Sequence, residues 1–178
     1  MTADSPFDDI MNSPIEIERK FLIRMPDTSL LSSIDGCRVM NMEQTYLLCE
    51  SGKNSRVRRI EENGKVRFVK TTKQRISTIS CYENEIEISA EQYANELKRS
   101  DIDKTPIIKT RYAFPFGEYT VEIDIYPFWN DRAILEIELS DENESIDVPD
   151  FIEVIKEVSD DAKYKNTNLA KSIPFDRI

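Results

Sequence analysis

Charged side chains recur at alternate positions along this sequence, and their types are those that bind phosphate and divalent metal ions. The like-charged sets are Glu16 with Glu18, Arg56 with Arg58, Glu83 with Glu85 and Glu87, Lys109 with Arg111, and Glu136 with Glu138. Carboxylate oxygens are hard ligands that suit Mg²⁺ or Mn²⁺, whereas arginine and lysine bind phosphate oxygens. The chain contains no histidine, which excludes Ser-His and Cys-His catalysis and His-ligated zinc in their usual forms.

The stretch from Ile15 to Phe21 indicates which kind of element carries these charges. Successive side chains of a β-strand point to opposite faces of a sheet. Glu16, Glu18 and Lys20 therefore share one face of this stretch, and mostly apolar residues share the other. About seven or eight such alternating segments, separated by turn residues, predict an antiparallel sheet that is rolled or closed. The fold class expected is α+β.

The charged faces have two interpretations. Like charges two residues apart on a strand lie roughly 7 Å apart and repel by roughly 2 kcal/mol at an effective dielectric constant of about 20. On an open sheet, water and salt screen this repulsion, and the alternation taken alone favours such a solvated face. Inside a closed barrel, the repulsion must be offset by neighbouring opposite charges, by divalent metal or by a phosphate chain.

Capping residues and helical spacing predict three helices beside the strands. They are residues 28–34, residues 90–99 behind the capping-box pair Ser89 and Gln92, and a C-terminal helix from near Ser159 towards Lys171.

Length and composition favour one compact domain. The 178 residues are 39% hydrophobic and 33% charged, and the expected organisation is a loose lead-in at 1–14 followed by a single domain at 15–178. The formal net charge of −10 argues against broad binding to nucleic acid or an anionic membrane. Three cysteines, with neither a paired spacing nor a signal-peptide core, favour a reduced, cytoplasmic protein.

Together these motifs resemble the CYTH, or triphosphate tunnel metalloenzyme, family. The residues that carry the resemblance are Glu16-x-Glu18-x-Lys20, Arg56-x-Arg58, Lys73 after Thr71-Thr72, Lys109-x-Arg111, Asp124, Glu136-x-Glu138 and the C-terminal stretch 157–170. They occur in the family's order and on matching strand faces, from Ile15 to Pro174. The opening Glu16–Leu22 and the C-terminal stretch look most like small bacterial inorganic tripolyphosphatases.

The resemblance implies a closed eight-stranded antiparallel β-barrel whose lumen is a tunnel, with helices packed outside. It implies metal-dependent hydrolysis of inorganic triphosphate to pyrophosphate and phosphate, with Mg²⁺ or Mn²⁺, two ions being expected. The alternatives left open are a nucleoside or thiamine triphosphatase, a class IV-type adenylyl cyclase, and a catalytically silent module that binds polyphosphate or nucleotide. The expected partner is a small triphosphate or polyphosphate substrate, without nucleic acid or membrane; a homodimer is left open.

The resemblance also assigns roles to individual residues. The substrate-binding residues it implies are Lys20, Arg56, Arg58, Lys73, Lys109 and Arg111. The metal ligands it implies are Glu16, Glu18, Asp124, Glu136 and Glu138. The catalytic residues expected are Lys20, Arg58 and Glu85, and the general base is not assigned. Cys81 departs from the family pattern, because relatives often carry a basic residue there; this leaves one phosphate contact open.

Overall fold

The computed structural model describes residues 10–178. Residues 1–9 of the expected lead-in therefore lie outside the described residues. The rest of the lead-in includes a short 3-10 helix, η1 (Ile10–Asn12), whose Ile10 is buried. Among the described residues, none of the helices has the length and apolar character needed to span a bilayer.

Nine strands and four further short helices follow η1 in the described part of the chain. They are β1 (Ile15–Arg24), α1 (Thr28–Ser33), β2 (Arg38–Leu47), β3 (Lys53–Glu62), β4 (Lys65–Arg75), β5 (Ser80–Ile88), α2 (Ala90–Leu97), β6 (Ile107–Phe116), β7 (Tyr119–Ile125), β8 (Arg132–Leu139), β9 (Val154–Glu157), η2 (Ala162–Tyr164) and α3 (Asn166–Leu169).

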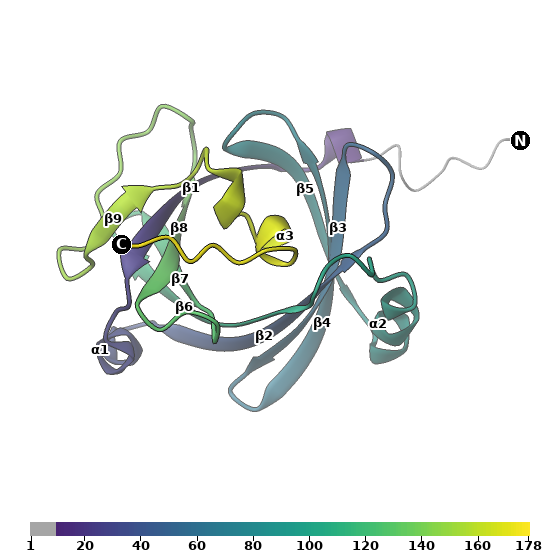
Figure 1. The fold of residues 1–178 in the computed structure, drawn as a ribbon, viewed down its shortest axis with the longest axis horizontal. Coiled ribbons are helices and arrows are strands. Elements are labelled where there is room, and N and C mark those ends of the chain that lie inside the picture. The colour runs from purple at the N-terminus through teal and green to yellow at the C-terminus, as the bar shows by residue number, and fades with distance from the viewer. Residues whose placement is uncertain (1–9) are drawn as a thin grey trace, which may run out of the picture.

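Eight of the strands close into an antiparallel barrel, which confirms the expected fold class. Around the barrel the order is β1-β8-β7-β6-β2-β3-β4-β5, and β5 pairs again with β1. In Figure 1 the strands form a ring, and α3 lies within its outline. Closure fixes which face of every strand points inward, so the alternation in the sequence becomes an inner charged surface and an outer apolar one.

β1 has different neighbours along its two halves. Residues Ile17 to Arg24 pair with β8 along one edge. Along the other edge, Ile15 to Ile17 pair with β5, whereas Phe21 to Ile23 pair with β9. β1 therefore joins the two ends of the sheet. It also pairs with β9, which among the described residues is the only strand outside the eight-stranded ring.

Outward-facing apolar side chains form two clusters under the outer elements. On β1, β6, β7 and β8, the larger cluster includes Phe21, Ile123 and Leu135, and it packs with Leu31 of α1 and Ile152. The smaller cluster places Tyr93 of α2 against Val57 of β3. Full burial of an aliphatic or aromatic side chain contributes about 1.5–3 kcal/mol, so these helices hold the barrel wall from outside.

Both outer helices, α1 and α2, begin with a side-chain cap. Asp27 accepts hydrogen bonds from the first backbone N–H groups of α1. Ser89 and Gln92 form the reciprocal capping box of α2, since each side chain accepts a hydrogen bond from the other residue's backbone N–H. The caps satisfy donors that have no partner inside the helix, which is why both helices begin where the sequence indicates.

The prediction of a single C-terminal helix from Ser159 to Lys171 is wrong. The segment instead contains η2 and the four-residue α3. Tyr164 and Leu169 are buried in a cluster with Tyr126 and Trp129 near one end of the barrel. In one continuous helix, Tyr164 and Leu169 would point about 140° apart, and a helix on the surface could not bury both. Two short helices joined by a turn bring both side chains into the same cluster.

Candidate active site

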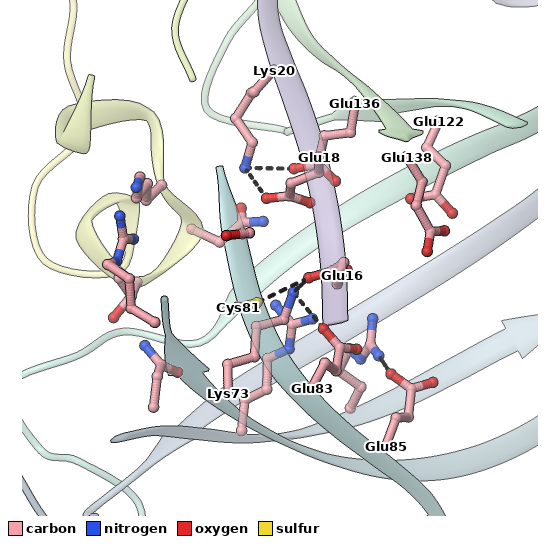
Figure 2. A pocket seen from close by; sticks show the side chains of 18 of the residues that line it. Glu16, Glu18, Lys20, Lys73, Cys81, Glu83, Glu85, Glu122, Glu136 and Glu138 are labelled. Carbon is pink, nitrogen blue, oxygen red and sulfur yellow. Dashed lines mark hydrogen bonds and ion pairs between the residues drawn. The ribbon is translucent and has the colours of Figure 1, made fainter. Parts of the chain in front are cut away.

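The inward faces of the barrel enclose one large polar cavity. Its volume is about 590 Å³, and its lining carries ten basic and seven acidic side chains, a formal charge of +3 inside a chain whose net charge is −10. Figure 2 shows these charges facing one another across the lumen. A concave site of this charge concentrates a field that favours a multivalent anion.

The structure brings together most of the residues that the sequence predicts. The cavity lining includes Glu16, Glu18, Lys20, Arg56, Arg58, Lys73, Glu85, Arg111, Glu136 and Glu138. Two of the sequence-predicted residues, Lys109 and Asp124, do not belong to this lining. The interpretation of the charged faces as one side of an open sheet is therefore wrong, because they line the lumen of a closed barrel.

One group of charges lies where β1 meets β8. The Lys20 ammonium is 2.6 Å from a Glu136 oxygen and 3.6 Å from a Glu18 oxygen. The two strands pair Lys20 with Glu136 and Glu18 with Glu138, so the register itself places the four side chains on one inward patch. The Lys20 backbone N–H also donates to Ser159 Oγ at 2.9 Å, which ties this part of β1 to the C-terminal segment.

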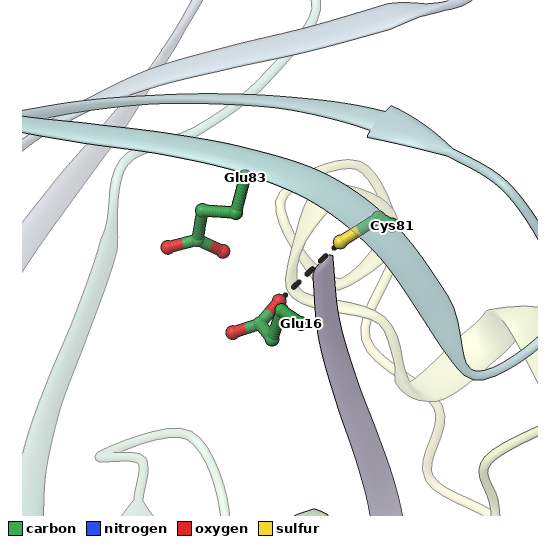
Figure 3. Close-up of side chains that lie close together, drawn as sticks. All are labelled: Glu16, Cys81 and Glu83. Carbon is green, nitrogen blue, oxygen red and sulfur yellow. Dashed lines mark hydrogen bonds between the residues drawn. The ribbon is translucent and has the colours of Figure 1, made fainter. Parts of the chain in front are cut away.

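A second group of charges comes from β1, β4 and β5, near the edge where β1 pairs with β5. Lys73 forms ion pairs with Glu16 and, at 2.5 Å, with Glu83. Cys81 Sγ donates to Glu16 Oε2 at 3.4 Å, and Figure 3 shows Cys81 and Glu16 facing each other across the β1–β5 seam. Ligand atoms of Glu16, Cys81 and Glu83 all lie within 4.8 Å of one another.

Arg58 is held by a third group on β3, β4 and β5. Its Nη2 donates to Glu85 and, at 3.1 Å, to Thr71 Oγ1; Thr71 Oγ1 donates in turn to the same Glu85 oxygen at 3.1 Å. Glu85 thus orients Arg58. Arg56, two residues earlier on the same inward face, forms no ion pair with any carboxylate of residues 10–178 and lines the cavity.

Arg111 is fixed by carboxylates behind and beside it. Asp124 accepts from its Nε and Nη2 at 2.7 Å, and Glu136 accepts from Nη2 at 2.7 Å. Glu122 pairs with its Nη1. Lys109 lies 2.5 Å from Asp124, and both side chains are almost fully buried, which makes them part of the barrel wall behind Arg111. Their predicted direct contacts with phosphate and metal remain predictions.

Burial and neighbouring charge act in opposite directions on the ionisable groups of the β1–β8 patch. Burial alone lowers the pKa of Lys20, but Glu136 and Glu18 raise it above its usual value. Burial alone raises the pKa of Glu136, but Lys20 and Arg111 hold it well below its usual value. Both groups are therefore charged at neutral pH.

In the group of Glu16, Lys73 and Glu83, burial and neighbouring charge shift the two carboxyl pKa values in opposite directions. Burial, together with the negative charges of Glu18 and Glu83, raises the pKa of Glu16 to about 7 against the opposing effect of Lys73. Burial also acts to raise the pKa of Glu83, but Lys73 and the hydrogen bond from Glu16 lower it to about 2. Because burial and the nearby carboxylates both disfavour its ionised form, Glu16 is the carboxylate of this group that gains most from a divalent cation.

Other residues of the lining were not predicted from the sequence. Arg67 of β4 and Glu122 of β7 belong to this group, and so do three residues of the C-terminal segment, Lys165, Asn166 and Thr167. Strand parity contained the signal for the first two, because Arg67 lies on the same strand face as Lys73, and Glu122 on the same face as Asp124. No pattern in the sequence indicates that residues 165–167 reach the lumen.

Comparison with known proteins gives one curated relative that spans nearly the whole chain. This chain is 34% identical over 158 residues to the protein named inorganic triphosphatase from Acetivibrio thermocellus, and the match covers 88% of this chain and 94% of the relative. The chain belongs to the inorganic triphosphatase family. The resemblance to triphosphate tunnel proteins is thereby confirmed. No family model matches the sequence of this member.

Solved structures agree with this family and fold. The crystal structure of the inorganic triphosphatase NE1496 superposes with a TM-score of 0.55 at 25% identity, covering 89% of this chain and 96% of that one. The PH1819 protein from Pyrococcus horikoshii gives a TM-score of 0.56 at 20% identity over 72% of this chain and 80% of that one, which supports the fold alone.

The donor set of the lumen fits the hard divalent cations expected of this family. Glu16, Glu18, Glu136 and Glu138 all offer carboxylate oxygens to one cavity. Mg²⁺ and Mn²⁺ prefer oxygen ligands and are bound through a few carboxylates together with substrate phosphates. The cluster of Glu16, Cys81 and Glu83 adds acidic ligands within reach of one another.

Proposed function

We propose that this chain hydrolyses inorganic triphosphate to pyrophosphate and phosphate inside the barrel, with Mg²⁺ or Mn²⁺ as cofactor. The observation that carries the proposal is the lining of the cavity, where cations and carboxylates alternate on facing strands and the basic side chains exceed the acidic ones. A triphosphate chain with bound metal carries both signs of charge, so it complements such a lining along its length.

The present ion pairs indicate how the lumen accepts its ligands. Lys20 is paired with Glu136, and Lys73 with Glu16 and Glu83. Carboxylates that bind a metal ion and ammonium groups that bind phosphate would each exchange one partner for another of the same sign. The desolvation of these groups is already incurred on folding, so substrate binding does not have to repeat it.

Individual residues then have distinct roles. Arg56 and Arg58 present guanidinium groups that bind phosphate oxygens through two hydrogen bonds, and Lys20 and Lys73 act as point charges. Arg111, held by Asp124, offers a guanidinium whose orientation is fixed in advance. Positioned cations of this kind stabilise the charge that spreads over the transferred phosphoryl group.

Carboxylates hold the metal and orient the cations. Glu16, Glu18, Glu136 and Glu138 are the proposed metal ligands, and Glu85 orients Arg58. A divalent metal bound there would neutralise phosphate charge and activate water for attack. The barrel wall excludes bulk water from the rest of the substrate, which strengthens each electrostatic contact.

A substrate panel with two variants tests this proposal. Phosphate release is measured from tripolyphosphate, pyrophosphate, long polyphosphate, ATP and thiamine triphosphate with each metal. We expect metal-dependent release from tripolyphosphate to fall at least about a hundredfold in Lys20→Met and in Glu138→Gln, because each loses a charge that acts in the transition state. Lys65→Met, at an exposed lysine outside the cavity lining, is the matched control.

Two results would overturn the proposal. Unchanged turnover in both variants would show that the lumen is not the site of reaction. Tight binding of tripolyphosphate by calorimetry without any phosphate release, under every metal, would identify a silent binding module instead. Preferred release from ATP or thiamine triphosphate would keep the site and change the substrate.

A further inference from the structure

Among the residues that the C-terminal segment contributes to the lumen is the uncharged polar residue Asn166. Asn166 begins α3, lines the cavity and is 8% exposed. In Figure 1, α3 lies inside the outline of the barrel rather than on its outer face. The mechanism described above, which depends on charged groups, does not use this residue.

The side chain of Asn166 is held in one orientation by Tyr126. The Tyr126 hydroxyl lies 2.7 Å from Asn166 Oδ1 and 3.5 Å from Asp124 Oδ2. It has one hydrogen to donate, and Asp124 already accepts from Lys109 and Arg111 at 2.5–2.7 Å. The Tyr126 hydroxyl therefore donates to Asn166 Oδ1.

This contact leaves the other end of the carboxamide available. With Oδ1 held by Tyr126, the Nδ2 group points away from the hydroxyl, and none of residues 10–178 accepts a hydrogen bond from it. An amide group in this position offers two N–H donors to the cavity that its residue lines. Neutral donors of this kind bind phosphate oxygens without adding to the positive charge of the lumen.

The backbone that carries Asn166 is fixed on both sides. Tyr164 and Leu169 are 1% and 2% exposed and pack in the cluster that contains Tyr126. Ala170 accepts a hydrogen bond from the Thr105 backbone N–H at 2.8 Å, which ties the segment to the chain before β6. A donor on so well supported a backbone is oriented before any ligand arrives.

We propose that Asn166 is a substrate-contacting residue, whose Nδ2 group donates a hydrogen bond to a phosphate oxygen in the lumen, and that Tyr126 is the positioning residue that orients it. The inference rests on the proposed function as far as the lumen binds tripolyphosphate. It assigns to the C-terminal segment a direct part in substrate recognition. The link through Asp124 places this contact on the same side of the lumen as Arg111.

Calorimetric titration with tripolyphosphate, together with steady-state kinetics, tests the assignment. A hydrogen bond to a charged group is worth about 1.5–3 kcal/mol, so Asn166→Ala should weaken binding about tenfold to a hundredfold. We expect the loss in KM with kcat little changed, because the contact is present before and during reaction. Asn168→Ala is the matched control, since Asn168 lies in α3, outside the cavity lining, and donates to Ala162.

Two further variants separate positioning from packing. Tyr126→Phe keeps the ring and removes only the hydroxyl, so it should weaken binding less than Asn166→Ala does. The double variant should bind no more weakly than Asn166→Ala alone, because Tyr126 acts through Asn166. Asn166→Asp keeps the acceptor for Tyr126 and replaces the donor by an anionic oxygen, so it should weaken binding further; it also serves if Asn166→Ala fails to fold.

Several outcomes would overturn the inference. Binding unchanged in both Asn166 variants would exclude the contact. An equal loss in Asn168→Ala would assign the effect to loosening of α3, and additive losses in the double variant would exclude positioning by Tyr126. Because calorimetry does not need turnover, a wild-type chain that binds without hydrolysis contradicts the proposed function and leaves the Asn166 comparison intact.

Discussion

Asp124 is the buried anion on which the wall behind Arg111 depends, and Asp124→Asn tests that dependence. Its carboxylate is fully buried and accepts from Lys109 at 2.5 Å and from two nitrogens of Arg111 at 2.7 Å. Asparagine keeps the size but removes the charge and turns an NH₂ group towards one of the two cations. The variant therefore leaves two buried positive charges without their common partner.

The magnitude follows from the depth of the cluster. Removal of one partner from a buried ion pair destabilises a protein by about 3–5 kcal/mol. For a chain of 150–250 residues, each kcal/mol shifts the thermal midpoint by about 2–4 °C, so Asp124→Asn should lower it by about 6–20 °C. Arg111 retains Glu136 and Glu122, which places the expected value towards the lower end of that range.

Thermal and urea unfolding, followed by circular dichroism without metal or substrate, measure the effect. Lys109→Met in the Asp124→Asn background should recover part of the stability, because it removes the cation that is left unpaired. Glu138→Gln is the control, since Glu138 faces the lumen, is exposed, and takes part in no ion pair among the described residues. It should leave the midpoint nearly unchanged.

A midpoint within about 2 °C of the wild-type value in Asp124→Asn would refute this reasoning. Loss of metal affinity at unchanged stability would instead favour Asp124 as a direct metal ligand. A double variant less stable than Asp124→Asn would show that Lys109 has a packing role independent of its charge.

Three further predictions concern protonation, reactivity and capping. Because the pKa of Glu16 is raised to about 7, its carboxyl group must lose a proton before it can bind a metal ion below neutral pH. Calorimetry should therefore show Mg²⁺ affinity falling about tenfold per pH unit below 7, and little pH dependence in Glu16→Gln. An equally steep pH dependence in that variant would exclude Glu16 as the titrating ligand. Burial raises the pKa of the Cys81 thiol to about 12, so mass spectrometry should find slower alkylation at pH 7 than at exposed Cys49, and faster alkylation would contradict the environment described for Cys81. Ser89→Ala should cost about 1 kcal/mol of stability in urea unfolding with kcat/KM unchanged, and an unchanged midpoint would show that the capping box contributes nothing to α2.

Strand parity predicts the side of each residue well, and that is why most of the proposed site follows from the sequence. Glu16, Glu18 and Lys20 face the lumen because their alternation survives barrel closure without a bulge at these positions. The same rule would have placed Arg67 and Glu122 inside, had it been applied to every charged residue.

The position of an inward-facing residue along the barrel axis cannot be predicted from strand parity, because it depends on contacts with residues far away in the sequence. Lys109 and Arg111 have the same parity, yet Lys109 lies in the wall and Arg111 lines the cavity. The aromatic cluster of Tyr126, Tyr164 and the neighbouring C-terminal residues fills one end of the barrel, and no local sequence pattern predicts this cluster. The short strand β9 was missed for the same reason, since its four residues are defined by pairing with β1.

The pairing of the first strand with the last strand of the ring has a consequence for how the chain acquires its fold during synthesis. Ile17 pairs with Leu139 and Arg24 with Arg132, so β1 emerges from the ribosome long before its partner β8 exists. Contacts between such distant segments form late and slow folding. Until then, Glu18 and Lys20 lack their β8 partners Glu138 and Glu136, and the lumen exists only after β8 closes the ring.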